Sequence, residues 1–378
     1  VLFRIRENLK YRNNDVTFSG NTVFTSWKLR HSLATQYSYL SWVPYLDMGL
    51  FDREALNIDK VRLRDMYWNL GYLDFKIEKV TVTPDESDPE YVNIHFDLYE
   101  GEPYVINSIK VEGAKSFADA ELLELVGSTP GQVFDYRREL GDKNHLLSLL
   151  HSEGYADASC QVKRVPDFKK HEVGLVYDLS EGRQYRVNQV MIVGNEFTKD
   201  KVIRRELVIF PDDPADANLL DFSKSRLLGM DMFESVDVSM VNANQFNQKD
   251  VVVKVKEKDA YDLRVGAGFS DVDSLFGVIE ASSRNFDITN PSNYFRGGGQ
   301  RVRLQAAFGI ERAALNLDFT EPWLFDLPLR LDVSAYMRQS IYEYWTEDRF
   351  GARVGLTRKF FDDFTSAIFN FHVPAYDS

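Results

Sequence analysis

One segment decides the fold: Tyr104-Val105-Ile106-Asn107-Ser108-Ile109-Lys110-Val111-Glu112-Gly113. Its tyrosine lies nine residues before its glycine, and the same spacing joins Tyr11 to Gly20 and Tyr185 to Gly194. A glutamate also lies four residues before each of the three tyrosines, at Glu7, Glu100 and Glu181. An internal period of this kind is typical of repeat architectures. We therefore expect about the first 260 residues to form three copies of one small domain.

Composition narrows the class of protein. The chain has 378 residues, a net charge of −13 and an aromatic content of 13%. This charge argues against nucleic acid as a partner, because a protein that binds nucleic acid needs a basic surface. No run of 18 apolar residues occurs, so no transmembrane helix is expected. The single cysteine, Cys160, has no partner for an internal disulfide and is expected to be a small buried hydrophobic residue.

Apolar spacing predicts the same order of elements in every repeat: a strand, two helices and two strands. In the first repeat we expect helices from about Ser26, with Thr25 as N-cap, and over about 52–70. Strands at about 75–83 and 91–99 follow. A three-stranded sheet of this kind can bury one face against two helices. Its edge strands stay unpaired and can accept a strand from another chain.

These patterns divide the chain into five parts. They are residues 1–8 as the end of a preceding repeat, 9–103, 104–184 and 185–259 as three repeats, and 260–378 as a different domain. No signal peptide is visible, and Val1–Glu7 alternates like a strand, so we expect the chain to begin inside a longer protein. The aromatic segment Tyr37–Leu46 is interpreted either as a cover for the core of the first repeat or as a contact surface for a partner.

The last 118 residues alternate between apolar and polar side chains. Seven strands are expected, at about 263–269, 276–285, 300–308, 313–320, 330–338, 350–359 and 365–371. Leu315, Leu317 and Phe319 share one face of their strand, and polar residues occupy the other. Strands of nine to ten residues with one apolar and one charged face favour a membrane β-barrel over the alternative, a soluble sandwich. Aromatic residues near the strand ends fit the girdles of such a barrel: Trp323, Phe325, Tyr342, Tyr344, Trp345, Phe360 and Phe361. Seven strands cannot close a membrane barrel, so a truncated barrel is expected.

Motifs for catalysis are weak. The six histidines show no metal-ligand spacing, and no serine-nucleophile motif occurs. Gly297-Gly298-Gly299 lacks the lysine and the serine or threonine of a phosphate-binding loop, and we interpret it as a bend that enters a strand. The sequence therefore predicts no catalytic residue, no cofactor and no metal.

The ordered set of motifs resembles a known family. Tandem units that begin Tyr…Gly-Asn and whose second helix ends in Gly-Tyr resemble POTRA domains, and a barrel that follows directly resembles the BamA-like outer-membrane β-barrel assembly factors. Three stretches carry the resemblance: Tyr67-Trp68-Asn69-Leu70-Gly71-Tyr72, Val193-Gly194-Asn195-Glu196-Phe197-Thr198, and Leu317-Asp318-Phe319-Thr320-Glu321-Pro322-Trp323. By this resemblance the three repeats are similar to the third, fourth and fifth, barrel-proximal, POTRA domains. The family's arginine-glycine-aromatic loop motif and its last barrel strand are absent, and Asp287–Tyr294 lengthens an early turn.

The resemblance implies a location and a function. The chain would lie in the outer membrane of a diderm bacterium, with its POTRA domains in the periplasm, and would assemble and insert β-barrel proteins. Implied partners are unfolded outer-membrane proteins, periplasmic lipoproteins of an assembly complex and outer-membrane lipid, and no nucleic acid. Client strands would pair with the edge of the first repeat, within about 76–82, at Lys76, Ile77, Glu78, Lys79 and Val80. They would then pair with a lateral gate at the first barrel strand, Leu263, Arg264, Val265, Gly266, Ala267, Gly268 and Phe269.

Several alternatives stay open at this stage. Gly266 and Gly268 either weaken a short strand that must open or allow curvature of the barrel wall. Three repeats and part of a fourth argue against a two-partner secretion pore, which carries two POTRA domains. They argue more mildly against a TamA-like translocation factor, which carries three. Some family members place a hydrolase domain before the repeats, and nothing in the sequence supports one here.

Overall fold

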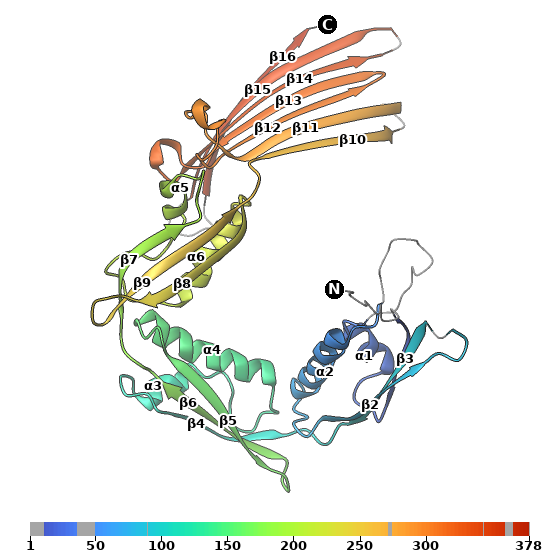
Figure 1. The fold of residues 1–378 in the computed structure, drawn as a ribbon, viewed down its shortest axis with the longest axis vertical. Helices are drawn as coiled ribbons and strands as arrows, with labels where there is room; N and C mark the ends of the chain where they lie inside the picture. The colour runs from blue at the N-terminus through green and yellow to red at the C-terminus, as the bar shows by residue number, and fades with distance from the viewer. Residues whose placement is uncertain are drawn as a thin grey trace, which may run out of the picture. The chain divides into compact units, whose positions relative to one another are not determined.

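The computed structural model describes residues 11–35, 50–88, 90–270, 274–342, 344–359 and 366–377. The chain forms two compact units. One unit comprises residues up to 150 together with 157–183, and the other comprises 151–156 together with 184 onwards. The predictions for residues 1–8 and for Tyr37–Leu46 lie outside the described residues. Figure 1 shows the order of elements along the chain.

The first repeat has the predicted order of elements. These are β1 (Arg12–Ser19), α1 (Ser26–Ser32), α2 (Arg53–Trp68), β2 (Lys76–Pro84) and β3 (Tyr91–Tyr99). Strand β3 lies in the middle of the sheet, parallel to β1 and antiparallel to β2. The Thr25 hydroxyl accepts a hydrogen bond from the Lys28 backbone N–H, which confirms the predicted N-cap. The apolar faces of the helices and of the sheet meet in a core around Leu63, Tyr67 and Phe96.

The second and third repeats follow the same plan. The second contains β4 (Val105–Glu112), α3 (Asp119–Glu124), α4 (Tyr136–Ser152), β5 (Ser159–Asp167) and β6 (Glu172–Ser180). The third contains β7 (Arg186–Val193), α5 (Asp200–Arg204), α6 (Asn218–Gly229), β8 (Phe233–Asn242) and β9 (Gln248–Glu257). The strand orders β4-β6-β5 and β7-β9-β8 match that of the first repeat. Among the described helices, none combines the length and the apolar character needed to cross a membrane.

The repeated glycine has a steric cause. Gly20 has φ +78°, and a Cβ there would lie 2.1 Å from the carbonyl oxygen of Leu98. Gly113 and Gly194 meet the carbonyl oxygens of Leu179 and Val255 in the same way. Only glycine adopts this backbone conformation without strain and leaves room for such an approach.

The repeated glutamate fastens the loop that follows each glycine. The Glu100 carboxylate accepts backbone hydrogen bonds from Thr22 and Val23 and a hydrogen bond of 2.7 Å from the Tyr67 hydroxyl. Glu181 accepts the corresponding N–H groups in the second repeat. In the third, Glu257 accepts those of Phe197 and Thr198, one position further from the glycine. Burial opposes the charge on Glu100, but the hydrogen bonds outweigh it and hold the pKa of this carboxyl below its usual value. We call the Glu100 carboxylate the clip of the first repeat, because it holds the Thr22–Val23 loop and the Tyr67 hydroxyl together.

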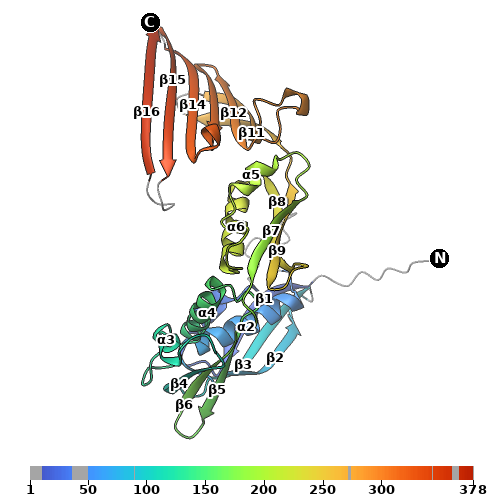
Figure 2. The ribbon, with the colours of Figure 1, turned by 90° about the vertical axis from the view of Figure 1, so that its left-hand side faces the viewer.

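Seven consecutive strands form an antiparallel sheet, a partial barrel (Figures 1 and 2). They are β10 (Tyr261–Ser270), β11 (Ser274–Phe286), β12 (Gln300–Gly309), β13 (Arg312–Glu321), β14 (Leu329–Ile341), β15 (Thr346–Lys359) and β16 (Ser366–Asp377). Their length of 10 to 14 residues slightly exceeds the prediction. Two short 3-10 turns interrupt the connections, η1 (Pro291–Asn293) and η2 (Leu324–Asp326).

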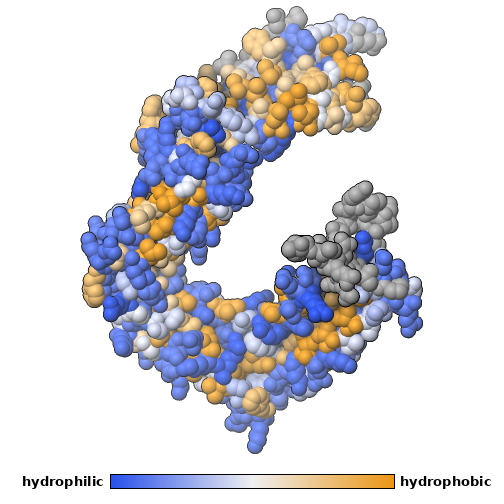
Figure 3. All heavy atoms as spheres, in the orientation of Figure 1, coloured by the Kyte–Doolittle hydropathy of each residue, from blue (hydrophilic) through white to orange (hydrophobic). Residues whose placement is uncertain are grey.

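The sheet has one polar and one apolar face, as predicted. The register places Gln305 opposite Asn316 and Asn316 opposite Tyr336 on the polar face. One residue further along each strand, Ala306, Leu315 and Met337 are paired in the same way on the apolar face. Hydrophobic residues gather over the strands of the sheet in Figure 3. An exposed apolar face of this kind is what a membrane strand presents to lipid.

Candidate functional site: two unpaired strand edges

The predicted client-binding residues of the first repeat lie at the start of β2. Among the described strands, β2 pairs only with β3, so its outer N–H and C=O groups face no neighbouring strand. A register shift between Ile77 and Lys79 makes Glu78 the extra residue of a bulge. The Lys76 ammonium lies 3.6 Å from the Glu78 carboxylate, and both side chains are more than half exposed. The edge is therefore accessible to an added strand along the segment 79–83 that follows the bulge.

A groove runs beside this edge, and the sequence did not indicate it. Its volume is about 500 Å³, and it is lined from β2 by Val82 and Pro84 and from α2 by Leu56, Asn57 and Lys60. The remaining lining residues are Tyr11, Phe51, Arg53 and Val92. Alternate side chains of a strand point to the same face. A strand added to β2 would therefore direct every second side chain toward α2 and this largely apolar groove.

The corresponding strand of the second repeat, β5, also pairs with a single described strand, β6, but one of its side chains belongs to a packed cluster. The Arg164 guanidinium on β5 donates hydrogen bonds of 2.6 and 2.5 Å to the buried Glu139 carboxylate on α4. The same guanidinium lies over the rings of Trp68, Phe134 and Tyr136, 4.7 to 5.8 Å from their centroids. Burial opposes its charge, yet the hydrogen bonds to Glu139 outweigh that cost and raise the pKa of Arg164. Because Trp68 belongs to the first repeat, this cluster ties the first two repeats together.

The predicted gate residues lie in β10, which pairs only with β11 among the described strands. The prediction of a short strand is wrong, because β10 has ten residues and all of them are in register with β11. A Cβ at Gly268 would lie 2.6 Å from the ring of Phe276, whereas Gly266 has open space around it. Gly268 therefore admits a packed aromatic ring, whereas a Cβ at Gly266 would meet no atom within 4 Å.

The third repeat is joined to the sheet by a buried polar network. The Asn285 amide donates a hydrogen bond of 2.7 Å to the Thr198 hydroxyl, and the Lys199 ammonium lies 2.5 Å from the buried Asp287 carboxylate. The glycine run that we interpreted as a bend lies at this contact. Gly297 has φ +105°, and a Cβ there would lie 2.1 Å from the Phe197 carbonyl oxygen. The run lets the loop press directly against the repeat.

Trp323 has a role that its sequence position did not reveal. Its indole N–H donates a hydrogen bond of 2.9 Å to the Glu206 carboxylate, and the Arg205 guanidinium lies 5.5 Å from its ring centroid. Trp323 thus contacts the third repeat, although it was predicted as part of an aromatic girdle. Other predicted girdle residues are exposed, namely Phe325, Tyr342, Tyr344 and Trp345. Phe360 and Phe361 lie outside the described residues.

The described residues show little sign of metal binding or of a reactive thiol. Within the part of the chain that the structure describes, no group of three or more His, Cys, Asp or Glu side chains is placed to hold a metal ion. Cys160 is buried, and burial raises the pKa of its thiol to about 11.

Two family models match the chain. The model of POTRA, described as a surface antigen variable number repeat, matches residues 11–101, 104–182 and 185–258. The model of the Omp85 superfamily domain matches residues 294–374. The first model thus covers most of the segment that contains the three repeats, and the second covers much of the sheet.

The chain is also similar to individual proteins. It is 26% identical over 322 residues to the outer membrane protein assembly factor BamA of Neisseria meningitidis, covering 84% of the chain and 39% of the relative. It is 24% identical over 334 residues to a putative outer membrane protein assembly factor of Treponema pallidum, covering 87% and 39%. The chain thus spans about two fifths of the length of these curated relatives.

Two solved structures share the fold. The crystal structure of BamA from Haemophilus ducreyi lacking POTRA domains 1–3 matches with a TM-score of 0.56 and 22% identity. The match covers 67% of the chain and 48% of that structure. The POTRA3–5 structure of Haemophilus influenzae BamA matches with a TM-score of 0.55 and 24% identity, over 65% of the chain and 96% of that structure. At these identities the likeness shows the fold alone.

Proposed function

Because the chain belongs to the POTRA-repeat proteins of the Omp85 superfamily, we propose that it assembles and inserts β-barrel proteins into the outer membrane of a diderm bacterium. Members of this group are outer-membrane proteins whose POTRA domains lie in the periplasm. The sheet therefore belongs to the membrane and the three repeats to the periplasmic side. The exposed apolar face of the sheet supports outer-membrane lipid as one partner.

One observation carries the proposal: the chain has an unpaired strand edge in a periplasmic repeat and another in the membrane sheet. These edges are β2 and β10. Unfolded outer-membrane proteins are chains of β-strands whose backbone groups need partners before they enter lipid. An edge strand offers a row of N–H and C=O groups to such a client without demanding a particular sequence.

The proposed route has two pairings. A client segment first adds to β2, where Lys76, Ile77, Glu78, Lys79 and Val80 flank the accessible edge. Its alternate apolar side chains enter the groove between β2 and α2. The client strand then pairs with β10 at Leu263–Phe269, where the side chains of Leu263, Val265 and Phe269 are already exposed on the apolar face. In each step, backbone groups of the client give up hydrogen bonds to water and form hydrogen bonds to an edge strand. In the second step this pairing takes place in lipid, where water offers no alternative partner.

Periplasmic lipoproteins of an assembly complex are further proposed partners. The names of the curated relatives support a role in assembly. The family resemblance supports recruitment of lipoproteins through the repeats.

Depletion of the protein in its host tests the function. We expect quantitative proteomics of the outer membrane to show a broad fall in unrelated β-barrel proteins, with induction of the periplasmic stress response. Re-expression of the protein should restore all of them together. Loss of one secreted protein with the other barrel proteins unchanged would contradict the proposal and favour a dedicated secretion pore.

A further inference from the structure

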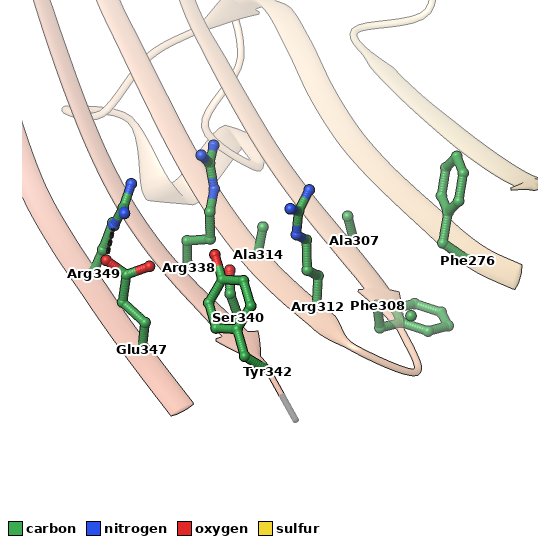
Figure 4. Close-up of a pocket in the computed structure, with 11 residues that line it drawn as sticks. Phe276, Ala307, Phe308, Arg312, Ala314, Arg338, Ser340, Tyr342, Glu347 and Arg349 are labelled. Carbon is green, nitrogen blue, oxygen red and sulfur yellow. Dashed lines mark hydrogen bonds and ion pairs between the residues drawn. The ribbon is translucent and has the colours of Figure 1, made fainter. Parts of the chain in front are cut away.

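Four arginines form a basic strip on the polar face of the sheet. They are Arg312 on β13, Arg338 on β14, and Arg349 and Arg353 on β15, and we call them the arginine strip. Figure 4 shows the first three rising from adjacent strands with their guanidinium groups directed the same way. The whole chain carries a net charge of −13, so this concentration of positive charge is local.

Two members of the arginine strip have no matching negative charge among the described residues. Arg349 pairs with Glu347, but neither Arg338 nor Arg353 has an ion pair with any residue that the structure describes. Arg338 also lies directly opposite Arg349 in the register of β14 and β15. Like charges in directly opposed positions destabilise a sheet. The nearby Arg303 differs, since the Asp318 carboxylate lies 3.2 Å from its guanidinium. The arrangement thus favours an added anion between the arginines.

The surface beside the arginine strip is hollowed and partly apolar. A hollow of about 400 Å³ brings Arg312, Arg338 and Arg349 beside Phe276 and Ala314. A second hollow, of about 480 Å³, is lined by Arg338, Arg349 and Arg353, by the paired Arg303 and Asp318, and by polar groups of Asn316 and Ser334. Gly351 separates Arg349 from Arg353 on β15, and a Cβ there would lie 2.6 Å from the Tyr336 hydroxyl. The ligand surface therefore combines cations with apolar and hydrogen-bonding groups.

The spacing of the arginines selects the kind of ligand. Arg349 and Arg353 are four residues apart on one strand and therefore about 13 Å apart along it. A single phosphate or sulfate is too small to contact both ends of the arginine strip. A nucleic acid is disfavoured because the protein is acidic overall and a nucleic-acid site needs a wider basic footprint. An extended peptide presents side chains of one face about 7 Å apart, so carboxylates on alternate residues match the row.

From this geometry we propose that the arginine strip binds an extended segment of a second polypeptide that carries acidic residues at alternate positions. Carboxylates on one face of the segment pair with Arg338 and Arg353, and the side chains at the intervening positions point away from the sheet. Arginine suits this role because its planar group can hold a carboxylate with two parallel hydrogen bonds. Peptide binding at the arginine strip does not depend on strand pairing at β2 and β10. A negative result in the peptide test therefore leaves the proposed assembly function standing, and a negative result for assembly leaves the peptide site standing.

The test uses the full chain in nanodiscs of zwitterionic lipid at about 20 mM ionic strength, where exposed charges are weakly screened. The probe is a fluorescein-labelled ten-residue peptide of alternating glutamate and leucine, followed by fluorescence anisotropy. We expect the double variant Arg338→Gln/Arg353→Gln to weaken binding by about tenfold or more, as two exposed charge contacts would. The matched control is Arg330→Gln, which removes an arginine already paired with Asp332 at 2.7 Å and should leave affinity within about twofold.

Further measurements separate binding from folding. Because the double variant relieves the repulsion between Arg338 and Arg349, its thermal unfolding temperature should equal or exceed that of the unchanged protein. Arg338→Lys/Arg353→Lys should retain more affinity than the glutamine variant, since the charges remain. No binding at low salt, equal losses in the double variant and the control, or equally tight binding of a ten-nucleotide single strand would each overturn the proposal.

Discussion

Strands β2 and β5 occupy the same position in two copies of one fold, yet the side chains that they carry have different surroundings. In β5, the Arg164 guanidinium is held by Glu139 and stacked on three aromatic rings, one of them in the neighbouring repeat. In β2, the charged side chains are exposed, and a groove lies beside the strand. A repeated architecture can therefore assign one edge to holding neighbouring repeats together and leave another free for a partner.

The largest effect should come from breaking the cluster on β5. Arg164→Ala leaves the Glu139 carboxylate buried without its cation, which typically costs about 3–5 kcal/mol. We expect this loss in urea unfolding of a fragment of residues 1–258. The matched change on β2, Lys76→Ala, removes an exposed pair and should cost less than about 1 kcal/mol. Similar losses in the two variants would contradict the distinction between the edges.

A second prediction concerns the clip that fixes the sheet carrying β2. Glu100→Gln should destabilise the first repeat by about 2 kcal/mol, because the part-buried N–H groups of Thr22 and Val23 lose a charged acceptor. The pKa of Glu100 is below its usual 4.5 in the folded state. Its contribution is therefore complete above pH 4.5 and is lost as the pH falls through the lower, folded-state value. Unfolding measured from pH 7 to pH 3 should show the difference between the two proteins shrinking with acid, and a constant difference would argue against a charged clip.

The third prediction extends the comparison to β10. Gly268→Ala should cost about 1–2 kcal/mol, because its Cβ must displace the Phe276 ring. Gly266→Ala meets open space and should be neutral or slightly stabilising, since alanine loses less backbone entropy than glycine. Unfolding of the full chain in detergent measures both. Equal costs at the two positions would show that the ring contact does not explain Gly268.

Periodic signals in the sequence predicted the elements well. The Tyr…Gly spacing identified the repeats because a positive φ and a close carbonyl demand glycine at Gly20, Gly113 and Gly194. Alternation identified the two faces of the sheet because a strand turns successive side chains to opposite sides. The edge position of β2 followed from the order of elements. Its use by a client stays a prediction.

Contacts between distant segments could not be read from the sequence. Trp323 and Glu206 are 117 positions apart, and no period relates them. The stacking of Arg164 on Trp68 depends likewise on how two repeats meet. The groove beside β2 combines side chains from a helix and three strands or their flanks, so no local pattern marks it. The length of β10 was underestimated because its pairing with β11 continues past the apolar alternation to Tyr261.

Thiol trapping of a client tests the central claim most directly. Cys160 is buried and should not compete, so Lys79→Cys on β2 and Lys163→Cys on β5 each provide one accessible thiol. The full chain in nanodiscs is mixed with an unfolded outer-membrane protein whose single cysteine is activated as a mixed disulfide with 2-nitro-5-thiobenzoate. Attack by the introduced thiolate forms the cross-link and releases the thiobenzoate, and each rate is divided by the rate of the same thiol with a small disulfide reagent. We predict mixed disulfides at position 79 about tenfold faster than at 163, the ratio given by a preference of 1.4 kcal/mol. Equal rates at the two positions would contradict the account.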